Sequence, residues 1–121
     1  MKKWAWFVLP LLFVFCALVL VSPVQAQSYP SHPIEMTIPF SPGDTVDLAG
    51  RAIANEMSEI LKTQVIVVNK PGGGGTIAAG SVVSGRKDGY SILFAVSGIY
   101  YAHAIDPASV PYNPLNDLDP L

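Results

Sequence analysis

From residue 34 onward, the apolar and polar positions follow first a β-strand period and then a helical one. Residues 34–40 (IEMTIPF) alternate in a β-rich run and predict a strand. That strand should end or bulge at Pro39, because proline has no N–H for a sheet hydrogen bond. Over residues 46–61, apolar side chains recur at steps of three and four residues, which is the period of a helix. The first predicted unit is therefore a strand followed by a helix.

The same alternation continues through the rest of the chain. Residues 64–68 (QVIVV) form an uninterrupted β-branched run, typical of a strand that is buried on both faces of a parallel sheet. Four glycines and a short helix over residues 76–84 follow, then a third strand over residues 90–96 and a short helix over residues 99–105. The order β-α-β-α-β predicts an α/β fold class with a parallel sheet and helices on both faces.

The N-terminus has the order of features typical of a secretory signal peptide. Lys2 and Lys3 precede an uncharged apolar run over residues 4–21. Val24 and Ala26 then place small residues at positions −3 and −1 of a cut after Ala26. The run is long enough for the alternative, a transmembrane anchor, but Pro10 interrupts it and the cleavage motif follows directly. We therefore predict a signal peptide over residues 1–26 and an exported domain over residues 27–121.

The composition of the exported part excludes several classes of function. Five basic side chains stand against nine acidic ones, a net charge of −4, which does not suit a nucleic-acid partner. The single cysteine, Cys16, leaves with the leader and takes with it any disulfide or cysteine metal site. His32 and His103 are isolated in the sequence, and no serine has a base nearby. We expect no enzyme, no cofactor and no metal, and keep an exported enzyme on a similar scaffold as the weaker alternative.

Three loops follow the three predicted strands and make the candidate binding site. In open α/β sheets, ligands bind beyond the carboxyl ends of the strands, where the helices begin. The loops at residues 41–45, 72–75 and 97–98 are rich in Gly, Ser or Thr, which offer hydroxyls and free backbone N–H groups to an anion such as a carboxylate or phosphate. The alternative is that the glycines only make tight turns and close contacts.

Two known nucleotide-binding motifs fit the glycine run poorly. Residues 73–78 match G-x-G-x-x-A, but the next strand ends in Val96-Ser97 without the carboxylate that a dinucleotide site needs for the ribose. A P-loop is excluded because no lysine follows the glycines. Asp44 and Asp47 could share a helix face as paired carboxylates, but we favour their roles at the helix start, where Asp44 or Thr45 caps the first turn.

Several linked motifs resemble the Bug family, the extracytoplasmic solute receptors of tripartite tricarboxylate transporters. They run in order over essentially the whole exported part of the chain. They are Tyr29-Pro30-Ser31-His32-Pro33-Ile34; Pro39-Phe40-Ser41-Pro42-Gly43 with Asp47 and Arg51; Val67-Val68-Asn69-Lys70-Pro71-Gly72-Gly73-Gly74-Gly75; Asp88-Gly89-Tyr90-Ser91-Ile92-Leu93; and Pro111-Tyr112-Asn113-Pro114 with Asp117 and Pro120.

The resemblance implies a type II periplasmic-binding-protein architecture with two α/β lobes, of which residues 27–121 cover the first part of the first lobe. It also implies a periplasmic location, a small organic acid as ligand, and the membrane subunits of the transporter as partners. Because the family is longer, we expect a truncated lobe, and the alternative function is that of a non-binding remnant. The ligand contacts that it implies are Phe40, Ser41, Pro42, Gly43, Thr45, Asp47, Gly74, Gly75, Thr76, Ser97 and Gly98. Asp44 stands where the family usually has glycine, and it would repel a carboxylate unless it turns away to cap the helix.

Overall fold

The elements follow the predicted order. The computed structural model describes residues 28–121, so the predicted signal peptide and its cleavage site lie outside the described residues. In chain order the elements are β1 (Ile34–Ile38), α2 (Thr45–Leu61), β2 (Val65–Asn69), η1 (Gly73–Gly75), α3 (Thr76–Val83), β3 (Ser91–Leu93) and α4 (Gly98–Ile105). As predicted, the first strand ends before Pro39; the third strand is shorter than the predicted run over residues 90–96.

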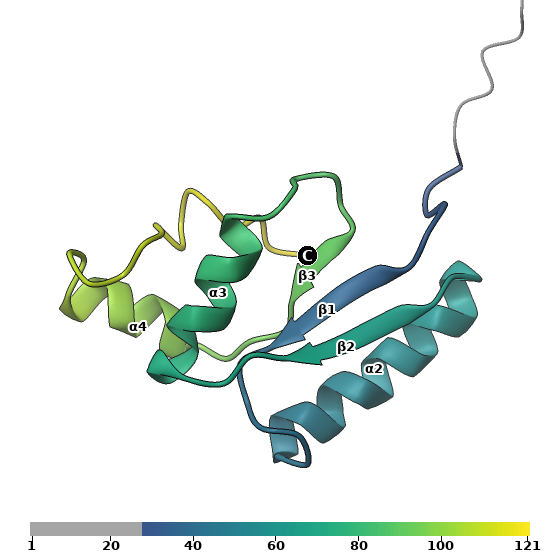
Figure 1. Cartoon of the computed structure of the whole chain (residues 1–121), viewed down its shortest axis with the longest axis horizontal. Coiled ribbons are helices and arrows are strands. Elements are labelled where there is room, and N and C mark those ends of the chain that lie inside the picture. The colour runs from purple at the N-terminus through teal and green to yellow at the C-terminus, as the bar shows by residue number, and fades with distance from the viewer. Residues whose placement is uncertain (1–27) are drawn as a thin grey trace, which may run out of the picture.

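The described strands form one parallel sheet in the order β2-β1-β3 (Figure 1). Ile34 of β1 is aligned with Val65 of β2, and Met36 with Ile92 of β3. The backbone continues the pairing beyond β3, since Phe94 N–H donates to the Thr37 carbonyl at 2.9 Å. The predicted α/β fold class and parallel sheet are confirmed.

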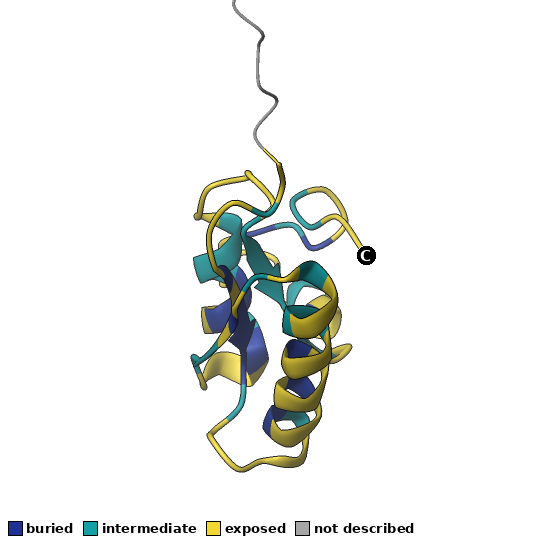
Figure 2. Cartoon of the chain, turned by 90° about the vertical axis from the view of Figure 1, so that its right-hand side faces the viewer, coloured by how far each residue is buried: buried dark blue, intermediate teal, exposed yellow. Residues whose placement is uncertain are grey.

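Helices cover both faces of the sheet, as predicted. On one face, β1 packs against α2 in a core of Ile34, Met36, Ile38, Ala54 and Val65. On the other face, α3 and α4 pack with the segment after α4 in a core of Ala79, Ile99, Val110 and Tyr112. Neighbouring residues of β3 divide between the two cores, because successive side chains of a strand point to opposite faces. Figure 2 shows the buried residues gathered where the sheet and its helices meet.

The prediction that the second strand is buried on both faces is wrong. β2 lies at the edge of the described sheet, and Ile66 is 43% exposed. Val65 and Val67 face the core under α2, whereas on the other face α3 packs mainly against β3 and β1, and Val68 of β2 is only half-buried. The central strand is β1, in which Met36 and Thr37 are both buried although they point to opposite faces.

The apolar surface of α2 is wider than the stripe that packs on the sheet. Gly50 and Ala54 are buried, whereas Ile53 and Ile60, two of the predicted apolar positions, remain exposed. A Cβ on Gly50 would lie 2.9 Å from Cδ1 of Phe94, so the glycine sets how closely the helix approaches the sheet.

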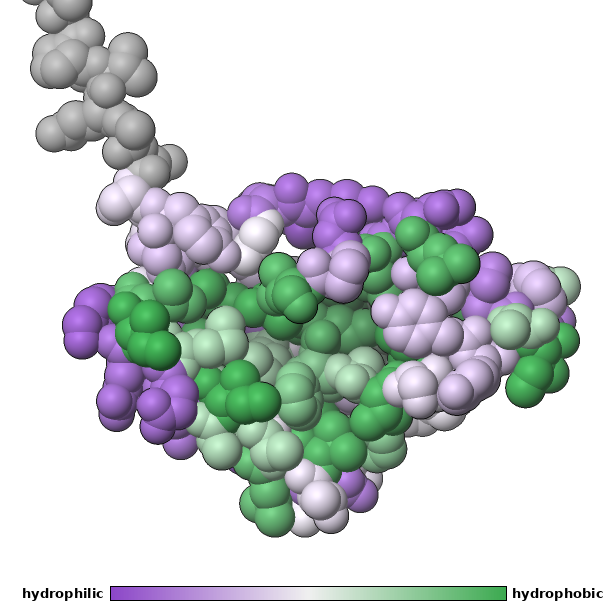
Figure 3. Space-filling model, turned by 180° about the vertical axis from the view of Figure 1, so that it is seen from behind, coloured by the Kyte–Doolittle hydropathy of each residue, from purple (hydrophilic) through white to green (hydrophobic). Residues whose placement is uncertain are grey.

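Figure 3 shows apolar side chains gathered over the middle of the rear face. Across residues 28–121, no helix has the length and hydropathy to cross a membrane.

Candidate functional site

The loops after the three strands meet at the carboxyl end of the sheet. A Cβ on Gly75 would lie 3.2 Å from Cγ2 of Ile99 and 3.4 Å from Cβ of Pro39. A Cβ on Gly98 would lie 3.3 Å from the carbonyl oxygen of Gly74. The glycine-rich turn therefore lies directly against the end of β1 and the start of α4. The structure thus brings together segments that are far apart in the sequence.

The strand order makes this end of the sheet a switch point. β1 and β3 are neighbours, yet the helix after β1 packs in the core that contains Met36, and the helix after β3 packs in the core that contains Ala79. After these two adjacent strands, the backbone therefore turns toward opposite faces of the sheet. In open α/β sheets, ligands bind in the crevice that such a divergence creates.

The four glycines make a turn that other residues adopt only with strain. Gly72, Gly73, Gly74 and Gly75 all have positive φ, at 126°, 58°, 62° and 99°. Gly75 N–H donates to the Gly72 carbonyl at 3.0 Å, and Thr76 Oγ1 donates to the Gly73 carbonyl at 2.9 Å. The tight turn and close contact considered for these glycines are therefore present, and the turn delivers the chain into α3.

Asp44 caps α2, as the sequence predicts. Its backbone is extended, with φ −66° and ψ 157°, and its Oδ1 accepts a hydrogen bond from Val46 N at 2.9 Å. The loop before it is closed by a hydrogen bond from Asp44 N–H to the Ser41 carbonyl at 3.1 Å. Thr45 is the first residue of the helix. Of the two capping candidates, Asp44 fills the role.

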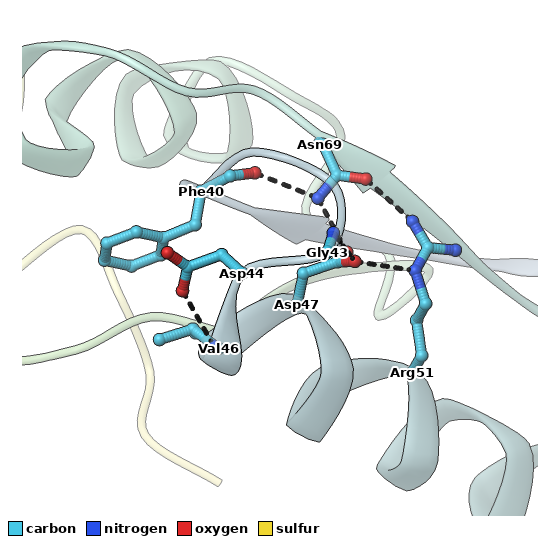
Figure 4. Close-up of polar contacts among 7 residues, drawn as sticks. All are labelled: Phe40, Gly43, Asp44, Val46, Asp47, Arg51 and Asn69. Atoms are coloured by element: carbon cyan, nitrogen blue, oxygen red, sulfur yellow. Dashed lines mark hydrogen bonds and ion pairs between the residues drawn. The ribbon is translucent and has the colours of Figure 1, made fainter.

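Asp47 is buried and takes part in a network of protein donors. It is 1% exposed, and its Oδ2 accepts from Gly43 N at 2.8 Å and from Arg51 Nε at 3.0 Å. Its Oδ1 accepts from Asn69 Nδ2 at 2.7 Å (Figure 4). These bonds, led by the one from Arg51, stabilise the charged form and lower the pKa of Asp47 to about 2. Both carboxylate oxygens are thus engaged by the protein itself.

Asn69 links the end of β2 to the loop after β1. Its Nδ2 also donates to the Phe40 carbonyl at 2.9 Å, and its Oδ1 accepts from Arg51 Nη2 at 2.8 Å. Both protons of the amide and its oxygen are therefore used. Phe40, Asp47, Arg51 and Asn69 form one network, which fixes the first loop against the second strand.

The eleven predicted contact residues differ in their exposure. Six are exposed: Ser41, Pro42, Gly43 and Thr45 of the first loop, and Gly74 and Ser97 of the other two. Phe40, Thr76 and Gly98 are half-buried, and Gly75 and Asp47 are buried. The structure brings the three segments to the same end of the sheet, and in this arrangement exposed hydroxyls and glycine backbone stand beside the beginnings of three helices.

Two residues of the network were not among the predicted site residues. Arg51 lies four residues after Asp47 on α2, a spacing at which opposite charges meet on a helix, so the sequence held a usable signal. Asn69 meets Asp47 across 22 residues of chain, and no local pattern indicates that contact. In residues 28–121, no group of three His, Cys, Asp or Glu side chains could hold a metal ion.

Residues 49–121 match the model of a protein family described as "Tripartite tricarboxylate transporter family receptor". The chain belongs to this receptor family. Among curated proteins it is similar to Protein BugT of Bordetella pertussis, with 35% identity over 103 residues, which cover 84% of this chain and 32% of BugT. The resemblance inferred from the motifs is therefore confirmed, and the chain spans about a third of the length of the curated relatives it matches.

Solved structures of this kind share the fold. A structure described as that of a periplasmic transporter aligns with a TM-score of 0.65 and 34% identity, over 72% of this chain and 29% of the other. MatC from Rhodopseudomonas palustris with bound malate aligns with a TM-score of 0.65 and 29% identity, over 74% of this chain and 30% of MatC. The fold of the described residues is therefore that of one part of a periplasmic binding protein.

Proposed function

We propose that this chain provides part of the first lobe of an extracytoplasmic receptor that binds a small organic acid. In this proposal the leader over residues 1–26 is cleaved after Ala26, the receptor works in the periplasm, and it delivers its solute to the membrane subunits of a tripartite transporter. Family membership and the malate bound to MatC support this class of ligand. No step of the proposal requires catalysis.

The observation on which the proposal rests is the meeting of the three loops at the switch point. Gly75 lies against Pro39 and Ile99, so the beginnings of α3 and α4 lie together beside the end of β1. Helix N-termini present unpaired N–H groups and a partial positive charge, which together suit a carboxylate. Exposed hydroxyls such as those of Ser41 and Ser97 add donors without adding charge.

Within this proposal the eleven residues divide into two roles. Ten of them contact the solute through backbone or side chain: Phe40, Ser41, Pro42, Gly43, Thr45, Gly74, Gly75, Thr76, Ser97 and Gly98. Asp47 instead holds the first loop, because its oxygens already accept bonds from Gly43, Arg51 and Asn69. Arg51 and Asn69 join it as positioning residues.

A thermal-shift and calorimetric screen of the full-length protein against mono-, di- and tricarboxylates tests the proposal. A ligand that binds only the folded state raises the melting temperature with its concentration. Ser41→Ala should weaken binding of the best acid, whereas Ser84→Ala, a matched loss of an exposed hydroxyl after α3, should leave it unchanged. The absence of any response across the panel would sink the organic-acid proposal.

A further inference from the structure

Asp44 is the one acidic side chain of the first loop whose charge the protein leaves uncompensated. The ion pairs found within residues 28–121 join Arg51 to Asp47 and Lys70 to Glu35, so neither cation forms an ion pair with Asp44. Asp44 is also exposed, whereas Asp47 is buried. At the carboxyl end of the sheet, the first loop therefore presents one fixed negative charge to solvent.

That charge stands where the α2 helix would otherwise attract an anion. Oδ1 of Asp44 accepts the N–H of Val46, one of the free donors of the first helical turn. In Figure 4, Asp44 points toward Val46, and Asp47 points the other way, toward Asn69 and Arg51. The side chain thus occupies a donor and also offsets the positive end of the helix dipole. The cap turns the side chain toward Val46 but leaves its charge exposed, so it weakens the repulsion of a carboxylate without removing it. A second anionic group placed at this helix would therefore still meet an occupied donor and a negative charge.

We propose that Asp44 is a specificity-determining residue that selects acids with a single carboxylate over dicarboxylates. The inference rests on the proposed function. The ligand carboxylate lies on the side of the glycine turn and α4, and an uncharged or cationic donor group, such as an amide, hydroxyl or ammonium, faces Asp44. A donor can bond to the free oxygen of Asp44, which a second carboxylate cannot do.

Succinate and succinamate give a matched pair of probes, since they differ only in whether one end is a carboxylate or an amide. Calorimetry on the full-length protein gives the ratio of their dissociation constants. Asp44→Asn removes the charge but keeps the cap, because Asn and Asp cap helices equally well. For a separation of about 6 Å in a largely aqueous dielectric, removal of one unit charge should shift this ratio toward succinate by about threefold.

Asp88→Asn is the matched control. Asp88 is also exposed, and its Oδ1 accepts the N–H of the residue two positions later, Tyr90, at 3.1 Å. Asp88 precedes β3, at the opposite end of the sheet, so this variant changes the net charge equally and leaves the site alone. Its ratio should equal that of the parent. The shift in Asp44→Asn should also shrink as salt is raised to about 0.5 M, because salt screens exposed charges.

The outcomes separate this inference from the function on which it rests. A shift toward succinate in Asp44→Asn alone, reduced by salt, supports the role of Asp44. An unchanged ratio in Asp44→Asn, or an equal change in Asp88→Asn, overturns that role while carboxylate binding stands. If neither the parent nor Asp44→Asn binds any carboxylate, the proposed function fails, and the specificity inference fails with it.

Discussion

The substitution Gly75→Ala tests the contact that brings the three loops together. Gly75 has φ 99°, and its added methyl group would lie 3.2 Å from Cγ2 of Ile99 and 3.4 Å from Cβ of Pro39. The left-handed backbone costs alanine about 1–2 kcal/mol, and crowding in a packed environment adds about 1 kcal/mol. Alanine also lowers the conformational entropy of the unfolded chain, which offsets about 0.5 kcal/mol of this loss. The expected loss in the free energy of unfolding is about 2 kcal/mol.

Gly74→Ala provides the control on the adjacent residue. Gly74 has φ 62°, close to the ordinary left-handed conformation, and nothing lies within 4 Å of an added Cβ. Only backbone strain remains, and the same entropy term offsets part of it, so the expected loss is about 1 kcal/mol, half that of Gly75→Ala. Urea denaturation followed by circular dichroism measures both values. If the two variants lose the same stability, the glycine turn does not pack against β1 and α4, and the argument for a joint site is refuted.

Three further substitutions test the contacts that hold these elements. Asp47→Asn should lower the melting temperature at pH 7. Because the pKa of Asp47 falls from 3.8 to about 2 on folding, this deficit should persist above pH 4 and vanish toward pH 2, as melting curves across that range would show. Ser58→Ala should cost about 1–2 kcal/mol in urea denaturation, since Ser58 Oγ accepts from Val65 N at 2.9 Å and that N–H loses its partner. Tyr90→Phe removes the hydroxyl that accepts from Ser31 N at 2.8 Å, and should cost about 1 kcal/mol and speed proteolysis before β1; unchanged proteolysis would contradict it.

The sequence predicted the elements because their signals are local. The apolar period over residues 46–61 and the proline after Ile38 each mark an element or its end without reference to the rest of the chain. Asp44 was recognisable as a cap for the same reason, since its partner Val46 lies two residues away. The linked motifs of the Bug family identified the family.

The strand order was beyond the reach of these signals. An uninterrupted apolar run such as residues 64–68 is found in central strands, yet β2 lies at the edge of the described sheet and β1 lies at its centre. The pattern records which side chains are apolar, whereas burial depends on which strand pairs with which. The hydrogen bond from Asn69 to Asp47 could not be predicted for the same reason, because it joins two elements that only the tertiary fold brings together.

Asp44 and Asp47 show how one turn of helix separates two carboxylates that the sequence presents as a pair. Asp47 lies on the side of α2 that faces β2, where Arg51 and Asn69 satisfy it and keep it ionised in a buried place. Asp44 lies one turn earlier, where within residues 28–121 its side chain bonds only to the backbone of Val46 and its charge reaches solvent. The buried carboxylate can therefore set the position of the loop without repelling a ligand, since its charge is paired. The charge of the exposed carboxylate can be removed without moving the loop, because Asn caps a helix as well as Asp does. Positioning and selectivity are thus separable in this loop, and Asp47→Asn and Asp44→Asn should have different effects: the first on stability and its pH dependence, the second on the choice between succinate and succinamate.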